Sequence, residues 1–181
     1  MRYMILAKRV TKQAMVMGMG AVEKAAEKGL VGLSRCFRGA VSGYKGSGKL
    51  LFVGSPYTCL PFAEFLSYAI RDLNMKTYFM PGLEVEKIRE IVPLEGYGFQ
   101  LGKVEGSGNF EVVVLLGGLA LPKTYVDPAS LRKALLRVSK LDYVVALFFQ
   151  GVMRKEEWLN EFKFSFIVDA DISKVVLEGL N

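Results

Sequence analysis

The chain has 181 residues, of which 51% are hydrophobic and 23% charged, and its formal net charge is +6. A chain of this length is expected to form one domain, and this balance of apolar and charged residues supports a packed core. The sequence contains no histidine and two cysteines, Cys36 and Cys59. These counts exclude hydrolysis with a histidine base, histidine-ligated zinc and a four-cysteine zinc site within one chain. Two cysteines do not make a disulfide framework, so we expect a reducing, cytoplasmic setting.

The positive charge is concentrated near the N-terminus. Residues 1–49 carry ten Lys or Arg against two Glu, whereas residues 50–181 carry 14 against 16 acidic residues. The segment has no long basic run and no interleaved aromatic residues, so we interpret it as a solvated basic segment and do not expect nucleic-acid binding. We predict a poorly ordered basic extension over residues 1–20 and a single α/β domain over residues 21–181. No stretch reaches the ~20 apolar residues that a membrane helix needs, so no membrane contact is expected.

The hydrophobic periodicity predicts helices alternating with strands along the chain. A helical pattern covers 21–40, and residues 94–109 are the least regular part, either one more short strand or a cover over the sheet. The predicted strands are 50–53, 76–80, 112–116, 143–149 and 164–168, and the predicted helices are 61–73, 83–91, 127–140 and 154–160. This alternation favours parallel strands joined by right-handed crossovers. We therefore expect a three-layer α/β/α sandwich with a mostly parallel five-stranded sheet, flavodoxin-like or Rossmann-like.

A glycine-rich stretch before the first predicted strand matches the spacing of a phosphate-binding P-loop. Gly43, Gly48 and Lys49 fit the pattern, but Leu50 stands where a magnesium-binding Ser or Thr is needed. The stretch also leads into a strand, whereas a P-loop follows one. We interpret it as a flexible connector.

The candidate site is predicted at the loop that joins the first strand to its helix. In a parallel sheet, loops 54–60, 117–123 and 149–154 meet at the carboxyl edge of the strands, where open α/β sheets bind ligands. Glycines there permit close approach to the backbone, and hydroxyl and amide groups add hydrogen bonds. Lys123 and Arg154 would favour an anionic metabolite or a nucleotide. The predicted ligand-binding residues are Gly54, Ser55, Thr58, Cys59, Gly117, Gly118, Lys123 and Gln150.

Cys59 also supports an alternative, catalytic hypothesis. It lies just before the first turn of the predicted helix, where backbone amides favour a thiolate, and Glu64 follows about one turn later as a base or anchor. The other interpretation makes Cys59 a small residue packed under the loop. Asp169 and Asp171 end the last predicted strand, but two acids without a third ligand do not define a metal site, and we predict none. The sequence does not identify a cofactor.

Several motifs lie in and around the predicted site loops. They are Gly54-Ser55-Pro56, Cys59, Pro61–Glu64, Tyr68–Asp72 and Leu115–Pro122. Together they resemble an uncharacterised archaeal family found mainly in methanogens and their relatives, over about residues 29–169. The resemblance implies an archaeal cytoplasmic α/β domain without an assigned activity, and the basic N-terminal extension departs from the family's pattern.

Three hypotheses about function stay open at this point. The first is a small-molecule binding module that uses the loops at the carboxyl edge. The second is an enzyme with Cys59 as nucleophile, and the third is an interaction protein with a basic N-terminal nucleic-acid contact. The apolar content is also compatible with a homodimer formed through an edge strand or a helix face.

Overall fold

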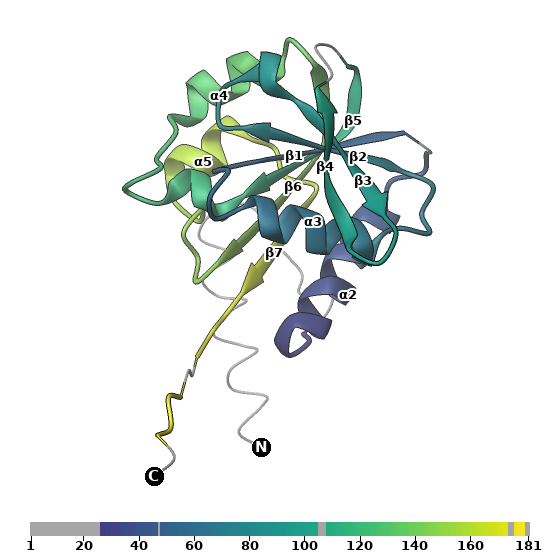
Figure 1. The fold of residues 1–181 in the computed structure, drawn as a ribbon. Coiled ribbons are helices and arrows are strands. Elements are labelled where there is room, and N and C mark those ends of the chain that lie inside the picture. Colours follow the sequence, from purple (N-terminus) through teal and green to yellow (C-terminus); the bar gives the residue numbers. More distant parts are fainter. Residues whose placement is uncertain (1–25, 47, 105–107, 174–175, 180–181) are drawn as a thin grey trace.

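The described residues form an α/β fold built on one seven-stranded sheet (Figure 1). The computed structural model describes residues 26–46, 48–104, 108–173 and 176–179, so the predicted extension over 1–20 lies outside the described residues. The strands are β1 Lys49–Gly54, β2 Lys76–Pro81, β3 Arg89–Leu94, β4 Gly98–Val104, β5 Phe110–Leu116, β6 Ser139–Phe149 and β7 Phe166–Ala170. The helices are α2 Gly29–Ser42, α3 Leu60–Ala69, α4 Pro128–Leu135 and α5 Glu156–Glu161, with short 3-10 turns η1 Val85–Lys87 and η2 Gly117–Ala120.

The sheet is mixed, with strand order β4-β3-β2-β1-β5-β6-β7. Strands β2, β1, β5, β6 and β7 are parallel to one another, whereas β3 pairs with β2 in the antiparallel sense and forms an antiparallel hairpin with β4. The prediction of a mostly parallel five-stranded sheet was therefore wrong, because the sheet is mixed and has seven strands in the described residues. The predicted helix over 83–91 is replaced by η1 and β3. Pro93 has no backbone N–H and does not continue a helix, and Gly96, with a φ of 78°, forms the hairpin turn.

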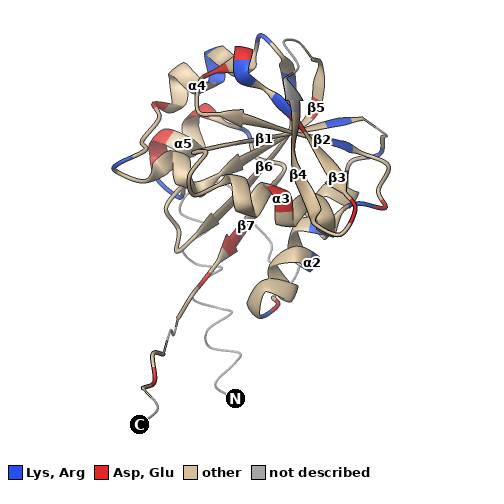
Figure 2. Ribbon diagram, in the orientation of Figure 1, with Lys and Arg blue, Asp and Glu red and all other residues tan. Residues whose placement is uncertain are grey.

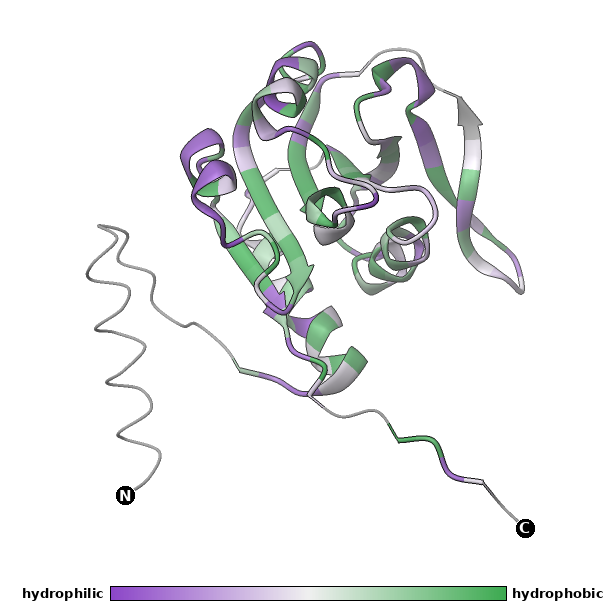
Figure 3. Cartoon of the chain, turned by 90° about the vertical axis from the view of Figure 1, so that its left-hand side faces the viewer, coloured by the Kyte–Doolittle hydropathy of each residue, from purple (hydrophilic) through white to green (hydrophobic). Residues whose placement is uncertain are grey.

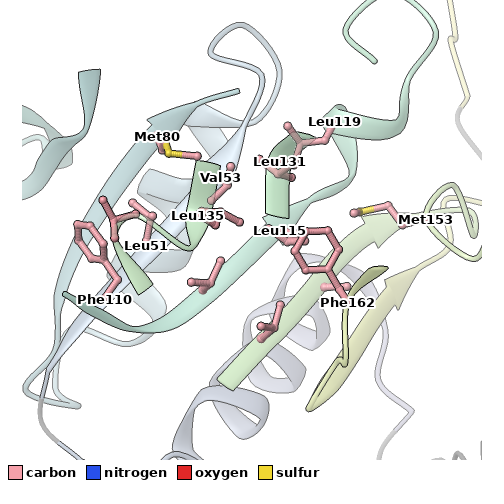
Figure 4. Close-up of a cluster of buried hydrophobic side chains, with 14 of the residues drawn as sticks. Leu51, Val53, Met80, Phe110, Leu115, Leu119, Leu131, Leu135, Met153 and Phe162 are labelled. Carbon is pink, nitrogen blue, oxygen red and sulfur yellow. The ribbon is translucent and has the colours of Figure 1, made fainter. Parts of the chain in front are cut away.

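Both faces of the central parallel strands are buried, each by a pair of helices. On one face, side chains of the central strands pack with Leu131 and Leu135 of α4 and Trp158 of α5, a cluster shown in part in Figure 4. On the other face they pack with Phe37 of α2 and Leu66 of α3. Because successive side chains of a strand point to opposite faces, strands buried on both faces are continuous apolar runs. Figure 3 shows these runs in green along the central strands.

Two helices begin and end where local chemistry dictates. The carboxylate of Asp127 accepts the backbone N–H of Ser130 at 2.8 Å, and Pro128 fills the first turn, so α4 begins at the predicted cap. Helix α3 ends at Ala69, four residues earlier than predicted. Its last carbonyl accepts Nη1 of Arg38 at 3.1 Å, and Arg38 also pairs with Asp72 in the turn that follows. Within the described ranges, no helix is long and apolar enough to cross a bilayer.

Candidate functional site

The loop after β1 is a tight turn that places Cys59 beneath it. The backbone N–H of Cys59 donates to the carbonyl of Ser55 at 2.8 Å, and the carbonyl of Cys59 accepts the N–H of Ala63 at 2.9 Å as α3 begins. Pro61 occupies the first turn of the helix, where its missing N–H costs nothing. The Cys59 side chain is consequently 4% exposed and packs with the α3 side of the core.

The Cys59 thiol fills the space between the loops that follow β1 and β5. A Cβ added at Gly54 would lie 2.7 Å from Cys59 Sγ, and one added at Gly118 would lie closer to that sulfur than real contacts allow. The Gly118 position would also meet Thr58 Oγ1 at 2.9 Å. These glycines therefore let one segment of the chain pack on another, with Cys59 as the shared contact.

Gly117 makes a similar close contact one strand further along the sheet. A Cβ at this position would lie 2.6 Å from the Cβ of Phe148 and 3.2 Å from Val152. The loops after β1, β5 and β6 thus follow adjacent parallel strands at one edge of the sheet, as the sequence predicted. At Gly54, Gly117 and Gly118, the space that a Cβ would need is filled by the chain's own side chains.

Burial raises the pKa of the Cys59 thiol. The Thr58 hydroxyl and the backbone of Ser55 and Gly118 lower this pKa by hydrogen bonding, but burial has the larger effect. The Thr58 oxygen lies 3.7 Å from the sulfur. A buried thiol with a raised pKa is a weak nucleophile near neutral pH, so the local environment favours the packing interpretation of Cys59.

A pocket of about 360 Å³ opens on the other side of the same loop. Its walls come from the segments that follow β1, β2 and β5, all at the carboxyl edge. The lining residues are Ser55, Pro56, Tyr57, Pro81, Gly82, Leu83, Glu84, Leu119, Thr124 and Val126. The charged residue in this set is Glu84, whose carboxylate accepts Lys87 Nζ at 2.5 Å. The pocket is therefore mainly apolar, with hydroxyl groups as its neutral polar side chains.

Ser55 is an unusual member of this lining because its hydroxyl is buried without a hydrogen-bond partner among the described residues. The hydroxyl of Thr124, in the same lining, donates to the carbonyl of Gly118 at 2.5 Å and is already engaged. A buried hydroxyl without a partner costs free energy. The Ser55 oxygen has almost no accessible surface, so Ser55 lines the pocket while its hydroxyl stays buried in the chain.

Other residues predicted for the site lie elsewhere in the fold. Glu64, the red segment of α3 in Figure 2, faces the hairpin, where its carboxylate accepts a hydrogen bond from the backbone of Leu101. Desolvation raises the pKa of Glu64, partly offset by that hydrogen bond. Lys123 is exposed and outside the pocket lining. Gln150, at the end of β6, donates to the carbonyl of Ile172 at 3.4 Å.

The second predicted cation, Arg154, is also engaged away from the pocket. Its Nε donates to a carboxylate oxygen of Asp169 at 2.7 Å, and the other oxygen of Asp169 accepts the N–H of Gly151 at 3.0 Å. No three acidic or cysteine side chains in the described segments gather as metal ligands. Asp169 is accounted for by these hydrogen bonds.

Sequence reasoning missed the wall that follows β2. Pro81 and Gly82 were interpreted as the turn into a helix, whereas they turn the chain along the pocket, with a Gly82 φ of 57°. The signal was available in the sequence, because a Pro-Gly turn directly after a buried parallel strand also lies at the carboxyl edge. Leu119 and Val126 were missed as well, and no local pattern distinguished them from core residues.

Comparison with known proteins identifies the family. Residues 28–173 match the family described as "Uncharacterized protein conserved in archaea (DUF2124)". The chain belongs to this family. The match covers the sheet and helices α2 to α5, and it confirms the resemblance inferred from the motifs.

Individual relatives and a solved structure agree with this assignment. The DUF2124 chain is 33% identical over 146 residues to the uncharacterized protein MJ1183 of Methanocaldococcus jannaschii, covering 81% of this chain and 88% of that protein. It is 32% identical over 144 residues to an uncharacterized protein of Methanothermobacter thermautotrophicus, covering 79% and 90%. A crystal structure of a protein of unknown function from the same organism has a TM-score of 0.76 and 31% identity, covering 88% of this chain and all of that one. None of these relatives is described with an activity, so the function has to be inferred from the site.

Proposed function

We propose that this DUF2124 protein is a small-molecule binding module whose ligand occupies the pocket of about 360 Å³ at the carboxyl edge of β1, β2 and β5. The observation that carries the proposal is this hollow at the edge where open α/β sheets bind their ligands. Its volume lies within the roughly 300–1,000 Å³ range of small-molecule sites. Its walls are apolar with a few polar groups, which is the composition typical of such sites.

The strand order of the parallel part supports this choice of edge. The parallel strands run β2-β1-β5-β6-β7, and the helices after β1 and β5, namely α3 and α4, pack on opposite faces of the sheet. Adjacent strands whose connections leave on opposite faces form the switch point at which ligands bind. We infer a flavodoxin-like arrangement, in place of a Rossmann-like one, with the β3–β4 hairpin added at one edge.

Binding without catalysis fits the chemistry of the lining. The chain has no histidine, and Glu84 in the lining is paired with Lys87. Cys59 is buried with a raised pKa and is absent from the residues that line the pocket. Both cysteines are free thiols, which supports the proposal of a cytoplasmic protein.

Native mass spectrometry after incubation with a library of anionic, cationic and neutral metabolites tests the proposal. We expect an added mass that disappears on denaturation, and the same spectrum reports whether the chain is a monomer or the homodimer considered above. Leu83→Trp should abolish the added mass because a large ring at this half-exposed wall residue fills the pocket. The matched control is Leu94→Trp, since Leu94 is 47% exposed compared with 43% for Leu83 and lies outside the lining. An unliganded wild type, or equal binding by both variants, would overturn the proposal.

A further inference from the structure

The two edge strands of the sheet differ in how they are protected against pairing with another strand. An edge strand exposes unpaired backbone N–H and C=O groups, and proteins block such edges with bulges, prolines or charged side chains. At the β4 edge, the register with β3 slips after Arg89, so β4 carries an extra residue. At the other edge, the pairing of β7 with β6 is continuous from Phe166 to Ala170, and the chain has no proline after Pro128. Strand β7 is therefore the less protected edge.

The tail that follows β7 extends away from the domain. Figures 1 and 3 both show this for its described residues, 171–173 and 176–179. Its apolar side chains face water, since Ile172 is 53% exposed, Val176 58% and Leu177 98%. The residues at which the tail would have to turn back, 171–173, include no glycine or asparagine of the kind that tight hairpins use. The tail therefore leaves the β7 edge of its own chain uncovered.

A second copy of the chain covers the open edge and the exposed tail together. When two identical chains pair antiparallel about a two-fold axis, both contribute the same surface to the contact. With the axis at Ile172, the tail of each copy runs along β7 of the other. Val176 then lies opposite Val168 of the second copy, and Leu177 lies opposite its Ile167. Nine residues follow Ile172, so the tail is long enough to cover the five residues of β7.

The charges at the end of β7 favour this register. An axis at Asp171 would place that carboxylate against the same carboxylate of the second copy, and an axis at Ala170 would place it against Asp169. Like charges directly opposite each other destabilise a pair of strands. An axis at Ile172 places Asp171 opposite Ser173 and keeps apolar residues opposite apolar ones.

We propose that two copies of this chain form a dimer by exchanging their C-terminal tails, each of which adds an antiparallel strand to the β7 edge of the other copy. The exchange buries Ile172, Val176 and Leu177 and joins the two sheets through one extended pair of strands. The proposal is independent of the ligand pocket, which lies at the carboxyl edge of β1, β2 and β5.

Sedimentation velocity of the full chain tests the association, and one substitution in the tail locates it. We expect the wild type to be mainly dimeric at about 100 μM. Leu177→Asp should weaken the dimer at least about ten-fold, because it places a charge against the apolar edge of β7. The control is Leu94→Asp, which makes the same change of charge at a residue that is 47% exposed on the β3–β4 hairpin, at the other side of the sheet. It should leave the dimer unchanged.

A cysteine at the proposed axis tests the register. The carbonyls of Ala170 and Ile172 accept N–H groups of Gln150 on the β6 side, at 2.9 and 3.4 Å. On the outer side, residue 172 would thus face its own copy as a non-hydrogen-bonded pair, the pair whose side chains approach most closely. In a Cys36→Ser background, Ile172→Cys should form a disulfide-linked dimer on mild oxidation, whereas Leu94→Cys should not.

Three outcomes would overturn the proposal. The first is a wild type that stays monomeric at about 100 μM. The second is a dimer that Leu177→Asp leaves intact, which would place the contact on another surface. The third is equal cross-linking of the Ile172→Cys and Leu94→Cys variants.

Discussion

The two sides of the loop after β1 differ in how they are filled. On the side that faces β5, the Cys59 sulfur occupies the space between Gly54 and Gly118 so closely that neither position admits a Cβ. On its other side, the same loop forms one wall of a hollow of about 360 Å³, and the segments after β2 and β5 form the other walls. One turn thus separates a closely packed contact from an open pocket.

This difference changes how the glycines in the site loops are interpreted. Glycine after a buried strand permits close approach to the backbone, and that approach is made either by a ligand or by another part of the chain. At Gly54 and Gly118 the approaching group is Cys59. The open side is lined instead by prolines and by large apolar residues. Close packing on one side holds the loop in place so that the other side keeps its shape, and the following predictions test this division.

The largest expected effect is on the packed side, in Gly118→Ala. The added methyl group overlaps Cys59 Sγ and approaches Thr58 Oγ1, so we expect the free energy of unfolding to fall by about 1–3 kcal/mol. Gly39→Ala is the control, since a Cβ at that exposed position of α2 meets nothing within 4 Å. It should raise stability by up to about 1 kcal/mol through helix propensity. Urea unfolding measures both changes.

A second substitution identifies the group that causes the loss. Cys59→Ala removes the sulfur and by itself leaves a small cavity, so it should also destabilise the fold. Combined with Gly118→Ala, the new methyl group takes the place of the sulfur, and the double variant should be more stable than the sum of the two changes predicts. Additive losses would show that the side chains at positions 59 and 118 are not in contact.

The next effect concerns the reactivity of the two cysteines. Because burial raises the pKa of Cys59 and shields its sulfur, iodoacetamide should modify it at least about ten-fold more slowly than the partly exposed Cys36 at pH 8. Peptide mass spectrometry measures both rates, and unfolding in denaturant should bring them together. Faster modification of Cys59 in the native protein would restore the hypothesis that it is a nucleophile.

The sequence was sufficient to predict the parallel strands but not the hairpin. Strands such as β1 and β5 are apolar runs of strand length bounded by turns, which is the pattern of a strand buried on both faces. The segment that forms η1 and β3 begins with Glu84 and Glu86, whose negative charges suit the first turn of a helix. Its tertiary partner, β2, decides its structure, and a pattern in one segment does not reveal that partner.

The same limit applies to the candidate site. Gly54, Ser55 and Gly118 were predicted from the turn residues that end parallel strands, and they lie together at the carboxyl edge. Which side of the loop would be open depended on the packing of the Cys59 side chain, and that packing is not encoded in any spacing. Lys123 and Arg154 were predicted to favour an anionic ligand because they are near the site loops in the sequence. Both residues lie outside the pocket lining.

A smaller effect of opposite sign is expected on the open side. Ser55→Ala removes a buried hydroxyl that has no partner in the described structure, so it should raise the stability of the unliganded protein by about 1 kcal/mol. Ser139 is buried to the same extent, but its hydroxyl donates to Phe110 and accepts the N–H of Leu141. Ser139→Ala should therefore lower stability by about 1–2 kcal/mol.

Urea unfolding of the two variants without ligand measures both changes in the free energy of unfolding. A loss of stability in Ser55→Ala would mean that its hydroxyl is satisfied within the chain, and the distinction between the packed and open sides would weaken. A gain would confirm that the Ser55 hydroxyl is buried without a hydrogen-bond partner in the folded chain.

The smallest effect concerns Glu64, which sequence reasoning paired with Cys59 and which contacts the β3–β4 hairpin in the structure. Desolvation raises its pKa in the folded state. Its contribution to stability is therefore complete below the usual Glu pKa of about 4.3 and is lost as the pH rises through the folded value. Glu64→Gln keeps an acceptor for Leu101 without the charge. It should be more stable than the wild type at pH 7, by less than about 1 kcal/mol because the group is only partly buried, and equally stable below about pH 4.

Glu86 supplies a control with the reverse sign. Its carboxylate accepts Nη2 of Arg137 at 2.7 Å, and this hydrogen bond lowers its pKa. Its stabilising contribution is present above the usual Glu pKa and is lost on acidification, so Glu86→Gln should be less stable than the wild type at pH 7. Urea unfolding at pH 4 and pH 7 measures both differences, and the other titrating groups cancel in each comparison. Two outcomes would contradict this prediction: a Glu64→Gln variant that is less stable at pH 7, or one that changes the alkylation rate of Cys59. Either outcome would mean that the Glu64 charge acts at the loop after β1, and it would support Glu64 as the base in the catalytic hypothesis.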